Sequence, residues 1–209
     1  MQENVGQTPK TAKLISVKFK RAKNVDLRSR EYLMTHEIDQ IRQCARASAR
    51  NTKLGHRDDT MILIMFRHAL RVGELITLRW EQIDFKLEIL HVKRIKSGVP
   101  STHPLRGAEL RALRQLKRDN QNSQYVFLSE LGTPLTNRSV HHIISKAGVA
   151  ANLGFSIHPH MLRHSTGFYL ANKGFDTRAI QSYMGHSNIK NTVIYTELSP
   201  NRFKKFWED

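Results

Sequence analysis

The sequence has little cysteine and no long apolar run, and these shortages exclude whole classes of protein. Its single cysteine, Cys44, rules out an internal disulfide framework and, within a predicted helix, is expected to be buried rather than reactive. The longest apolar run, from Met61 to Phe66, is far shorter than the roughly 18 residues of a membrane span. The polar amino terminus shows no signal-peptide pattern. We therefore expect a cytoplasmic protein with no membrane partner.

Acidic residues are scarce as well. The 209 residues include 34 Lys and Arg against 18 Asp and Glu, which gives a formal net charge of +16. This charge indicates a polyanionic partner, with nucleic acid ahead of an anionic membrane surface, and a basic surface without function is the alternative. Hydrophobic residues make up 39% of the chain, so bulk disorder is excluded and a real core is expected. The length favours one domain, or one domain with a tail.

A cluster of carboxylates for Mg²⁺ is also missing. The only adjacent Asp pair, Asp58-Asp59, is better explained as the first turn of a helix. Chemistry at a phosphodiester gathers negative charge on the nonbridging oxygens, which a metal ion or a pair of arginines can neutralise. Without a metal, such a site needs two arginines, groups that transfer protons and a nucleophile. We expect no metal and no cofactor.

The spacing of apolar residues predicts a mainly helical α+β domain with one small antiparallel sheet. Thr35 is the expected N-cap of the first helix. Further helices are predicted at Asp58 to about Leu70, Gly73 to Leu78, Ala108 to Lys117, Asn137 to Ala151, Pro159 to Lys173, Thr177 to Met184, Ile189 to Thr196 and Pro200 to Trp207. The sheet is predicted from a strand at residues 87–92, a turn at Lys96-Ser97-Gly98 and a returning strand at Val99 to Leu105.

Two parts of the chain differ in character. Residues 1–30 carry many Lys and Arg without a clear period, which predicts a basic arm that is mobile in the free protein. Alternation from Leu14 to Phe19 allows a short strand within it. Residues 31–209 form the predicted folded domain and include the helix at residues 200–207.

The first candidate segment surrounds Arg71. This residue follows a predicted buried helix and precedes a short one, a boundary where a charge is costly unless it is paired. Glu74 is placed to orient it. From this segment alone, a plain cation at a helix end is the better explanation.

The second candidate segment runs from His158 to His164. His160 and Arg163 lie three residues apart and share one helical face, so both are able to point at one phosphate. Arginine donates two hydrogen bonds in a fork, and histidine moves a proton near neutral pH. A pair of surface cations is the alternative, which the apolar Met161-Leu162 beside them weakens.

Two further candidates are a tyrosine and a lysine. Tyr195 follows His186 by nine residues, and nearby Arg or His would have to activate its hydroxyl, whose ordinary pKa is about 10. A lone tyrosine usually serves packing. Lys96, on the predicted turn, is placed to protonate a leaving oxygen. Alternatively, Lys93, Arg94 and Lys96 line a basic hairpin that contacts phosphates.

Taken in order, these segments resemble the tyrosine recombinase (phage integrase) family over most of the chain, from about Arg30 to Phe206. Each segment is weak evidence alone, and the ordered set is strong. The segments that carry the resemblance are Leu70-Arg71-Val72-Gly73-Glu74-Leu75, Ile95-Lys96-Ser97-Gly98, His160-Met161-Leu162-Arg163-His164, and Met184-Gly185-His186-Ser187 through Thr192-Val193-Ile194-Tyr195-Thr196.

The resemblance implies a DNA strand transferase that is independent of metal and ATP. The roles it implies are a phosphate clamp for Arg71 and Arg163, proton transfer or hydrogen bonding for His160 and His186, a general acid for the leaving 5′-hydroxyl in Lys96, and a nucleophile that forms a 3′-phosphotyrosyl link in Tyr195. Glu74 would support Arg71. Residues expected to contact DNA are Lys93, Arg94 and His164.

The resemblance also suggests partners. Many family members carry a helical domain before the catalytic one, whereas only a basic segment of about 30 residues precedes Arg30 here. This form resembles the short recombinases that invert bacterial fimbrial promoters. The expected partners are double-stranded DNA, further copies in a tetramer on paired sites and an accessory DNA-bending protein, which would place the protein at the bacterial nucleoid. The segment at 200–207 would dock on a neighbouring subunit or on its own domain.

Two alternatives to a site-specific recombinase remain open at this stage. The first is an enzyme that nicks and reseals one strand, as a topoisomerase does. The second is a basic DNA-binding protein that has lost catalysis, which the intact set of candidate residues disfavours. The DNA sequence recognised, and whether inversion, integration or excision results, are not encoded in these segments.

Overall fold

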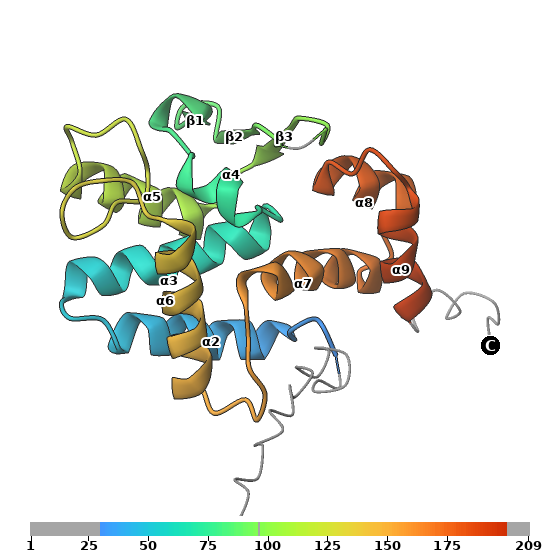
Figure 1. The fold of residues 1–209 in the computed structure, drawn as a ribbon. Helices are drawn as coiled ribbons and strands as arrows, with labels where there is room; N and C mark the ends of the chain where they lie inside the picture. Colours follow the sequence, from blue (N-terminus) through green and yellow to red (C-terminus); the bar gives the residue numbers. More distant parts are fainter. Residues whose placement is uncertain (1–29, 96, 200–209) are drawn as a thin grey trace, which may run out of the picture.

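The computed structural model describes residues 30–95 and 97–199 (Figure 1). Most of the predicted basic arm, Lys96 and the predicted helix at 200–207 therefore lie outside the described residues. The elements are, in chain order, α2 (Thr35–Ala47), α3 (Thr52–Arg67), α4 (Val72–Ile76), η1 (Trp80–Gln82), β1 (Ile83–Asp84), β2 (Ile89–Val92), β3 (Ser101–Pro104), α5 (Gly107–Asp119), α6 (Asn137–Ala150), α7 (Pro159–Asn172), α8 (Thr177–Met184) and α9 (Lys190–Leu198). The predicted mainly helical fold with one small sheet is confirmed.

Helix α3 lies at the centre of the helical body, where α2, α5 and α7 pack on it (Figure 1). Helix α3 is buried around most of its circumference, and Met61, Ile62 and Ile64 have no exposed surface. Helices α7, α8 and α9 pack on one another and form a second, smaller apolar cluster. None of the helices in the described ranges is both long and apolar enough to pass through a membrane.

The small sheet is antiparallel, in the order β1-β2-β3. Strands β2 and β3 pair from Ile89 with Pro104 to Val92 with Ser101, which confirms the predicted hairpin. The two-residue strand β1 was not predicted, because two residues are too short to show alternation. Beyond the turn, the N–H of Val99 donates to the carbonyl of Gly185, at a distance of 3.2 Å. The hairpin is therefore tied to the end of α8.

The first two helices begin differently from the prediction. Thr35 is the first residue of α2 and not its N-cap, because the Glu37 carboxylate accepts the N–H of Met34 at 2.7 Å and caps the helix there. Helix α3 begins at Thr52 rather than Asp58, because Asn51 accepts the N–H of Leu54 at 2.9 Å. The expected burial of Cys44 is only partial.

The predicted place of Asp58-Asp59 in a first helical turn is therefore wrong. Both residues lie inside α3, where each forms an ion pair. Asp58 lies 2.7 Å from a guanidinium nitrogen of Arg57, and Asp59 lies 2.7 Å from Nε of Arg42 on α2. Asp59 thus helps to join α3 to α2, whereas the ion pair of Asp58 lies within α3.

Candidate active site

Arg71 caps the start of α4 and is held by Glu74. Its backbone N–H donates to Oε2 of Glu74 at 3.0 Å, and its Nη1 donates to Oε1 at 2.8 Å, so the predicted contact between the two residues is present. The Glu74 side chain is 1% exposed and that of Arg71 is 28% exposed. Burial acts to raise the pKa of Glu74, but hydrogen bonds from Arg71 and the charge of Arg94 hold it below its usual value. The Arg71 guanidinium is thus held by Glu74 but remains partly exposed to solvent.

Arg163 enters the same place from α7. It is 2% exposed, and its guanidinium donates to the carbonyl of Ala69 and, at 2.7 Å, to that of Met184. Ala69 has a φ of 52°, a left-handed conformation that costs an L-residue about 1–2 kcal/mol. The turn at Ala69 closes α3 and sets Arg71 at the start of α4. Burial, together with Arg71 and Arg94, lowers the pKa of Arg163 to about 9.

Two histidines complete the site. His160 lies one turn before His164 on α7, with ring centroids 4.5 Å apart. His186 follows α8, and its Nδ1 lies 2.9 Å from Oγ1 of Thr192. Desolvation, together with nearby charged groups that include Arg71 and Arg163, lowers the pKa of each of these two histidines to about 4, although His160 is exposed and His186 is buried. Both imidazoles are therefore neutral near pH 7.

Tyr195 on α9 lies among these groups but is packed away. It is 4% exposed, its hydroxyl lies 2.8 Å from Nδ1 of His164, and its ring stacks at 6.4 Å on that of His186. Burial raises the pKa of Tyr195 to about 12, against the opposing effect of Arg163. In this state the phenol is protonated and covered.

The structure therefore brings together five predicted site residues that are distant in the sequence, namely Arg71, His160, Arg163, His186 and Tyr195. Lys96 lies outside the described residues. Its neighbour Ile95 donates its N–H to Oε1 of Glu74 at 3.4 Å, so the hairpin turn starts at this site.

The three predicted DNA contacts differ in their surroundings. Lys93 is exposed, with Nζ 3.3 Å from Glu81, and remains a predicted contact. Arg94 differs from Lys93, because its side chain has no exposed surface and pairs with Glu74. His164 is half-buried against Tyr195 rather than free on the surface. His164 follows His160 by four residues and so lies on the same helical face, which is the sequence pattern that indicates its place in the site.

Gly167 is a part of this site that the sequence did not reveal. A Cβ atom at this position would lie 2.6 Å from two ring carbons of Tyr195, far inside normal contact. The absent side chain therefore makes room for the ring. Its place four residues after Arg163 on α7 is the signal that could have identified it.

The close contact at Gly167 leads to a prediction. Gly167→Ala is expected to push the Tyr195 ring out of its pocket, so that the pKa of this phenol falls from about 12 toward its ordinary value. Ultraviolet titration of the variant should show one more tyrosine that ionises near pH 10. Gly107→Ala is a matched control for a methyl added to a helical glycine, because its Cβ would meet only the flexible end of the Arg111 side chain, at 3.3 Å. An unchanged titration of Gly167→Ala would show that the ring adjusts in place.

The buried histidines lead to a second prediction. Burial lowers the pKa of His103 to about 3 and that of His186 to about 4, from ordinary values of 6.5. Between pH 6.5 and about 4 the unfolded chain binds protons that the folded protein does not, so stability present above pH 6.5 is lost as the pH falls. We expect each group to remove on the order of 2 kcal/mol of unfolding free energy by pH 4.5.

Urea unfolding at a series of pH values measures this loss. His103→Asn should flatten the dependence, whereas His141→Asn, on the exposed face of α6, should not. Equal pH dependence in the wild type and in His103→Asn would contradict the prediction.

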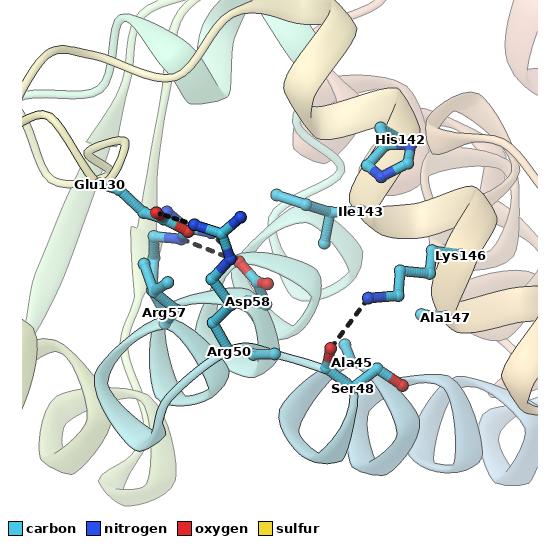
Figure 2. Close-up of a pocket in the computed structure, with 12 residues that line it drawn as sticks. Ala45, Ser48, Arg50, Arg57, Asp58, Glu130, His142, Ile143, Lys146 and Ala147 are labelled. Carbon is cyan, nitrogen blue, oxygen red and sulfur yellow. Dashed lines mark hydrogen bonds and ion pairs between the residues drawn. The ribbon is translucent and has the colours of Figure 1, made fainter.

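A hollow of about 440 Å³ lies between α2, α3 and α6, and none of the site residues above lines it (Figure 2). Its charged groups are already occupied. Arg50 pairs with Glu130 at 3.0 Å, and Lys146 donates to the carbonyl of Ser48 at 3.0 Å (Figure 2). Because these side chains already have partners, we do not assign the candidate active site to this hollow. Within the described ranges, no group of three or more His, Cys, Asp or Glu is arranged to hold a metal ion.

Comparisons with known proteins relate the chain to one protein family. The model of the phage integrase family matches residues 31–202. Type 1 fimbriae regulatory protein FimB of Escherichia coli strain K12 is 39% identical over 188 residues, which cover 88% of this chain and 92% of FimB. Tyrosine recombinase XerC of Bacillus pumilus is 31% identical, over 80% of this chain and 58% of XerC.

A solved structure with the same fold is the XerH site-specific recombinase bound to palindromic difH substrate in a post-cleavage complex. It has a TM-score of 0.71 and 18% identity, over 84% of this chain and 52% of XerH. At this identity the likeness concerns the fold alone, and it covers about half of XerH.

Proposed function

Because this chain belongs to the phage integrase family, we propose that Tyr195 cleaves DNA at a backbone phosphate held by Arg71 and Arg163. The protein is a site-specific DNA recombinase, a strand-transferring enzyme that needs neither metal nor ATP. The observation that supports the residue roles is the excess of positive charge around Glu74. Arg71, Arg94 and Arg163 surround a single carboxylate, Glu74, and the pKa of Arg163 is lowered by burial and by the other two arginines. A phosphate would relieve this repulsion.

The proposed reaction is a transesterification. The Tyr195 phenol transfers its proton to a neutral imidazole, His160 or His186, its oxygen bonds to phosphorus, and the bond to the 5′ oxygen breaks. Lys96 supplies the proton that the 5′ oxygen gains, while neutral His160 and His186 donate or accept hydrogen bonds at the phosphate. The 3′ end remains linked to Tyr195, so attack by a 5′-hydroxyl reseals the strand without another energy source.

The buried state of Tyr195 implies that cleavage is gated. Its hydroxyl is held by His164 and its ring lies over Gly167, so α9 needs to shift before attack. We infer that binding to DNA, or to a neighbouring subunit on DNA, supplies the energy for this shift.

The proposal includes partners and domain organisation. Residues 31–209 would form the catalytic domain, and the basic arm would add phosphate contacts to the duplex. The solved relative that shares the fold holds its difH DNA substrate. We propose double-stranded DNA as the partner, with four copies on paired sites joined through the carboxy-terminal segment and with an accessory protein that bends the DNA.

A trapping experiment tests the proposed function. In a duplex nicked close to the cleavage site, the short fragment that carries the released 5′-hydroxyl dissociates after cleavage. The strand is then unable to reseal, so a covalent adduct accumulates. We expect this adduct to form in excess EDTA and to map to the peptide that contains Tyr195. Loss of the adduct in EDTA would point to a metal-dependent nuclease. A substrate with two sites separates strand exchange from simple nicking and resealing.

A separate prediction concerns Lys96. Lys96→Ala is expected to bind DNA nearly as well as the wild type but to cleave at least about 100-fold more slowly, the usual contribution of a general acid. Gel-shift and single-turnover cleavage assays on one preparation measure both quantities. A 5′-bridging sulfur leaves without protonation and should restore much of the rate. Equal losses of binding and cleavage would favour a phosphate-contact role instead.

A further inference from the structure

Arg94 is a third buried arginine at this site, and its donors are almost fully used. Its Nη1 donates to Oε2 of Glu74 at 2.9 Å and to the carbonyl of Ala69 at 3.1 Å. Its Nη2 donates to the carbonyl of Tyr183 at 2.8 Å and to that of His68 at 3.3 Å. Its side chain has no exposed surface. A group with this burial and this many partners does not serve as a surface contact.

The carbonyls that Arg94 binds lie at the ends of two helices. His68 and Ala69 follow the last turn of α3, and Tyr183 lies in the last turn of α8. The last carbonyls of a helix have no partner within it and carry partial negative charge. Arg94 therefore joins the end of α3, the end of α8 and the base of the β2–β3 hairpin at one guanidinium.

The charge of Arg94 also determines how strongly the Glu74 carboxylate neutralises Arg71. Oε1 of Glu74 faces Nη1 of Arg71, whereas Oε2 faces Nη1 of Arg94. The carboxylate is 1% exposed, so it requires a cation beside it. Without Arg94, Arg71 would be left as the guanidinium hydrogen-bonded to Glu74, and the carboxylate charge would act mainly on it. Arg71 would then be neutralised by Glu74 instead of by the DNA phosphate.

We propose that Arg94 is a positioning residue for strand cleavage, which acts as the buried counter-ion of Glu74 and so leaves the charge of Arg71 available to the scissile phosphate. This inference rests on the proposed function, because it assumes that Arg71 binds that phosphate. Arg94 itself does not touch DNA. Its effect passes through Glu74 and through the turn at Ala69.

A charge-compensating pair of variants tests the proposal. Arg94→Met removes the counter-ion and is expected to slow single-turnover cleavage at least about tenfold, with DNA affinity nearly unchanged. Adding Glu74→Gln removes the carboxylate that would capture Arg71, so the double variant Arg94→Met/Glu74→Gln should cleave faster than Arg94→Met alone. If Arg94 served packing only, the second substitution would remove another contact and slow cleavage further.

Two controls complete the experiment. Arg118→Met, on the exposed end of α5, removes one positive charge far from the site and should cleave at the wild-type rate. Arg94→Lys keeps the charge and should lie closer to the wild type than Arg94→Met does, with each assay run below the melting midpoint of its variant. Equal rates for Arg94→Lys and Arg94→Met would overturn the proposal, as would a double variant no faster than Arg94→Met. Failure of the proposed function is distinguishable, because the wild type would then form no adduct at Tyr195.

Discussion

Tyr195→Phe is expected to abolish the covalent protein–DNA adduct on a nicked substrate while leaving the fold intact. Phenylalanine lacks the oxygen that would bond to phosphorus, and no neighbouring side chain replaces it. The ring keeps its place over Gly167 and beside His186. Only the hydrogen bond to His164 is lost, which costs about 1 kcal/mol and lowers the melting temperature by about 2–4 °C. Denaturing electrophoresis measures the adduct, and a thermal melt measures the fold.

Tyr183→Phe is the matched control. The Tyr183 hydroxyl donates to the carbonyl of Arg67 at 2.7 Å, and its ring stacks on His103 at 3.8 Å, so its role is to hold the hairpin strand β3 against α8. The adduct should persist in this variant. If Tyr195→Phe still formed an adduct and Tyr183→Phe did not, the nucleophile would be Tyr183, and α9 would have only a structural role.

The parts of the site that were predictable from the sequence are those with local signals. The three-residue spacing of His160 and Arg163 places them on one helical face before any tertiary contact is known. The hairpin was predictable because alternation and a turn signal occur within about 20 residues. The helix starts were less predictable. Polar residues such as Asn51 and Thr35 are both good caps, and only the backbone geometry shows which one acts.

Other features depend on contacts that no local pattern contains. Alanine is the best helix former, so the identity of residue 69 gives no signal of a left-handed conformation. The carbonyl of Ala69 accepts hydrogen bonds from Arg163 and Arg94, which lie far from it in the sequence. Arg94 follows Lys93 and has the pattern of a hairpin cation. Its burial depends on Glu74, 20 residues earlier, and on Tyr183, 89 residues later. The covered state of Tyr195 depends similarly on His164, 31 residues earlier.

The two arginines of the proposed phosphate clamp should differ in what their loss does to stability. Arg71→Ala is expected to slow cleavage by about 10²–10³-fold, the usual effect of removing one donor to a developing negative charge. Its melting temperature should change little, because Glu74 keeps the ion pair with Arg94 and the backbone donors of Arg71 and Ile95. Single-turnover cleavage and a thermal melt on the same preparation separate the two effects.

Arg163→Ala should lose both cleavage and stability, because its guanidinium is 2% exposed and holds the carbonyl of Met184. Leaving that carbonyl without a donor costs about 1–3 kcal/mol, or a fall of several degrees in melting temperature, since about 1 kcal/mol corresponds to 2–4 °C. Relief of the repulsion from Arg71 and Arg94 offsets part of this cost. A variant that kept full stability but lost cleavage would show that Arg163 moves toward DNA rather than holding α8. Cleavage at the wild-type rate would show that Arg163 is not part of the phosphate clamp, because α7 has no other arginine or lysine that could replace it.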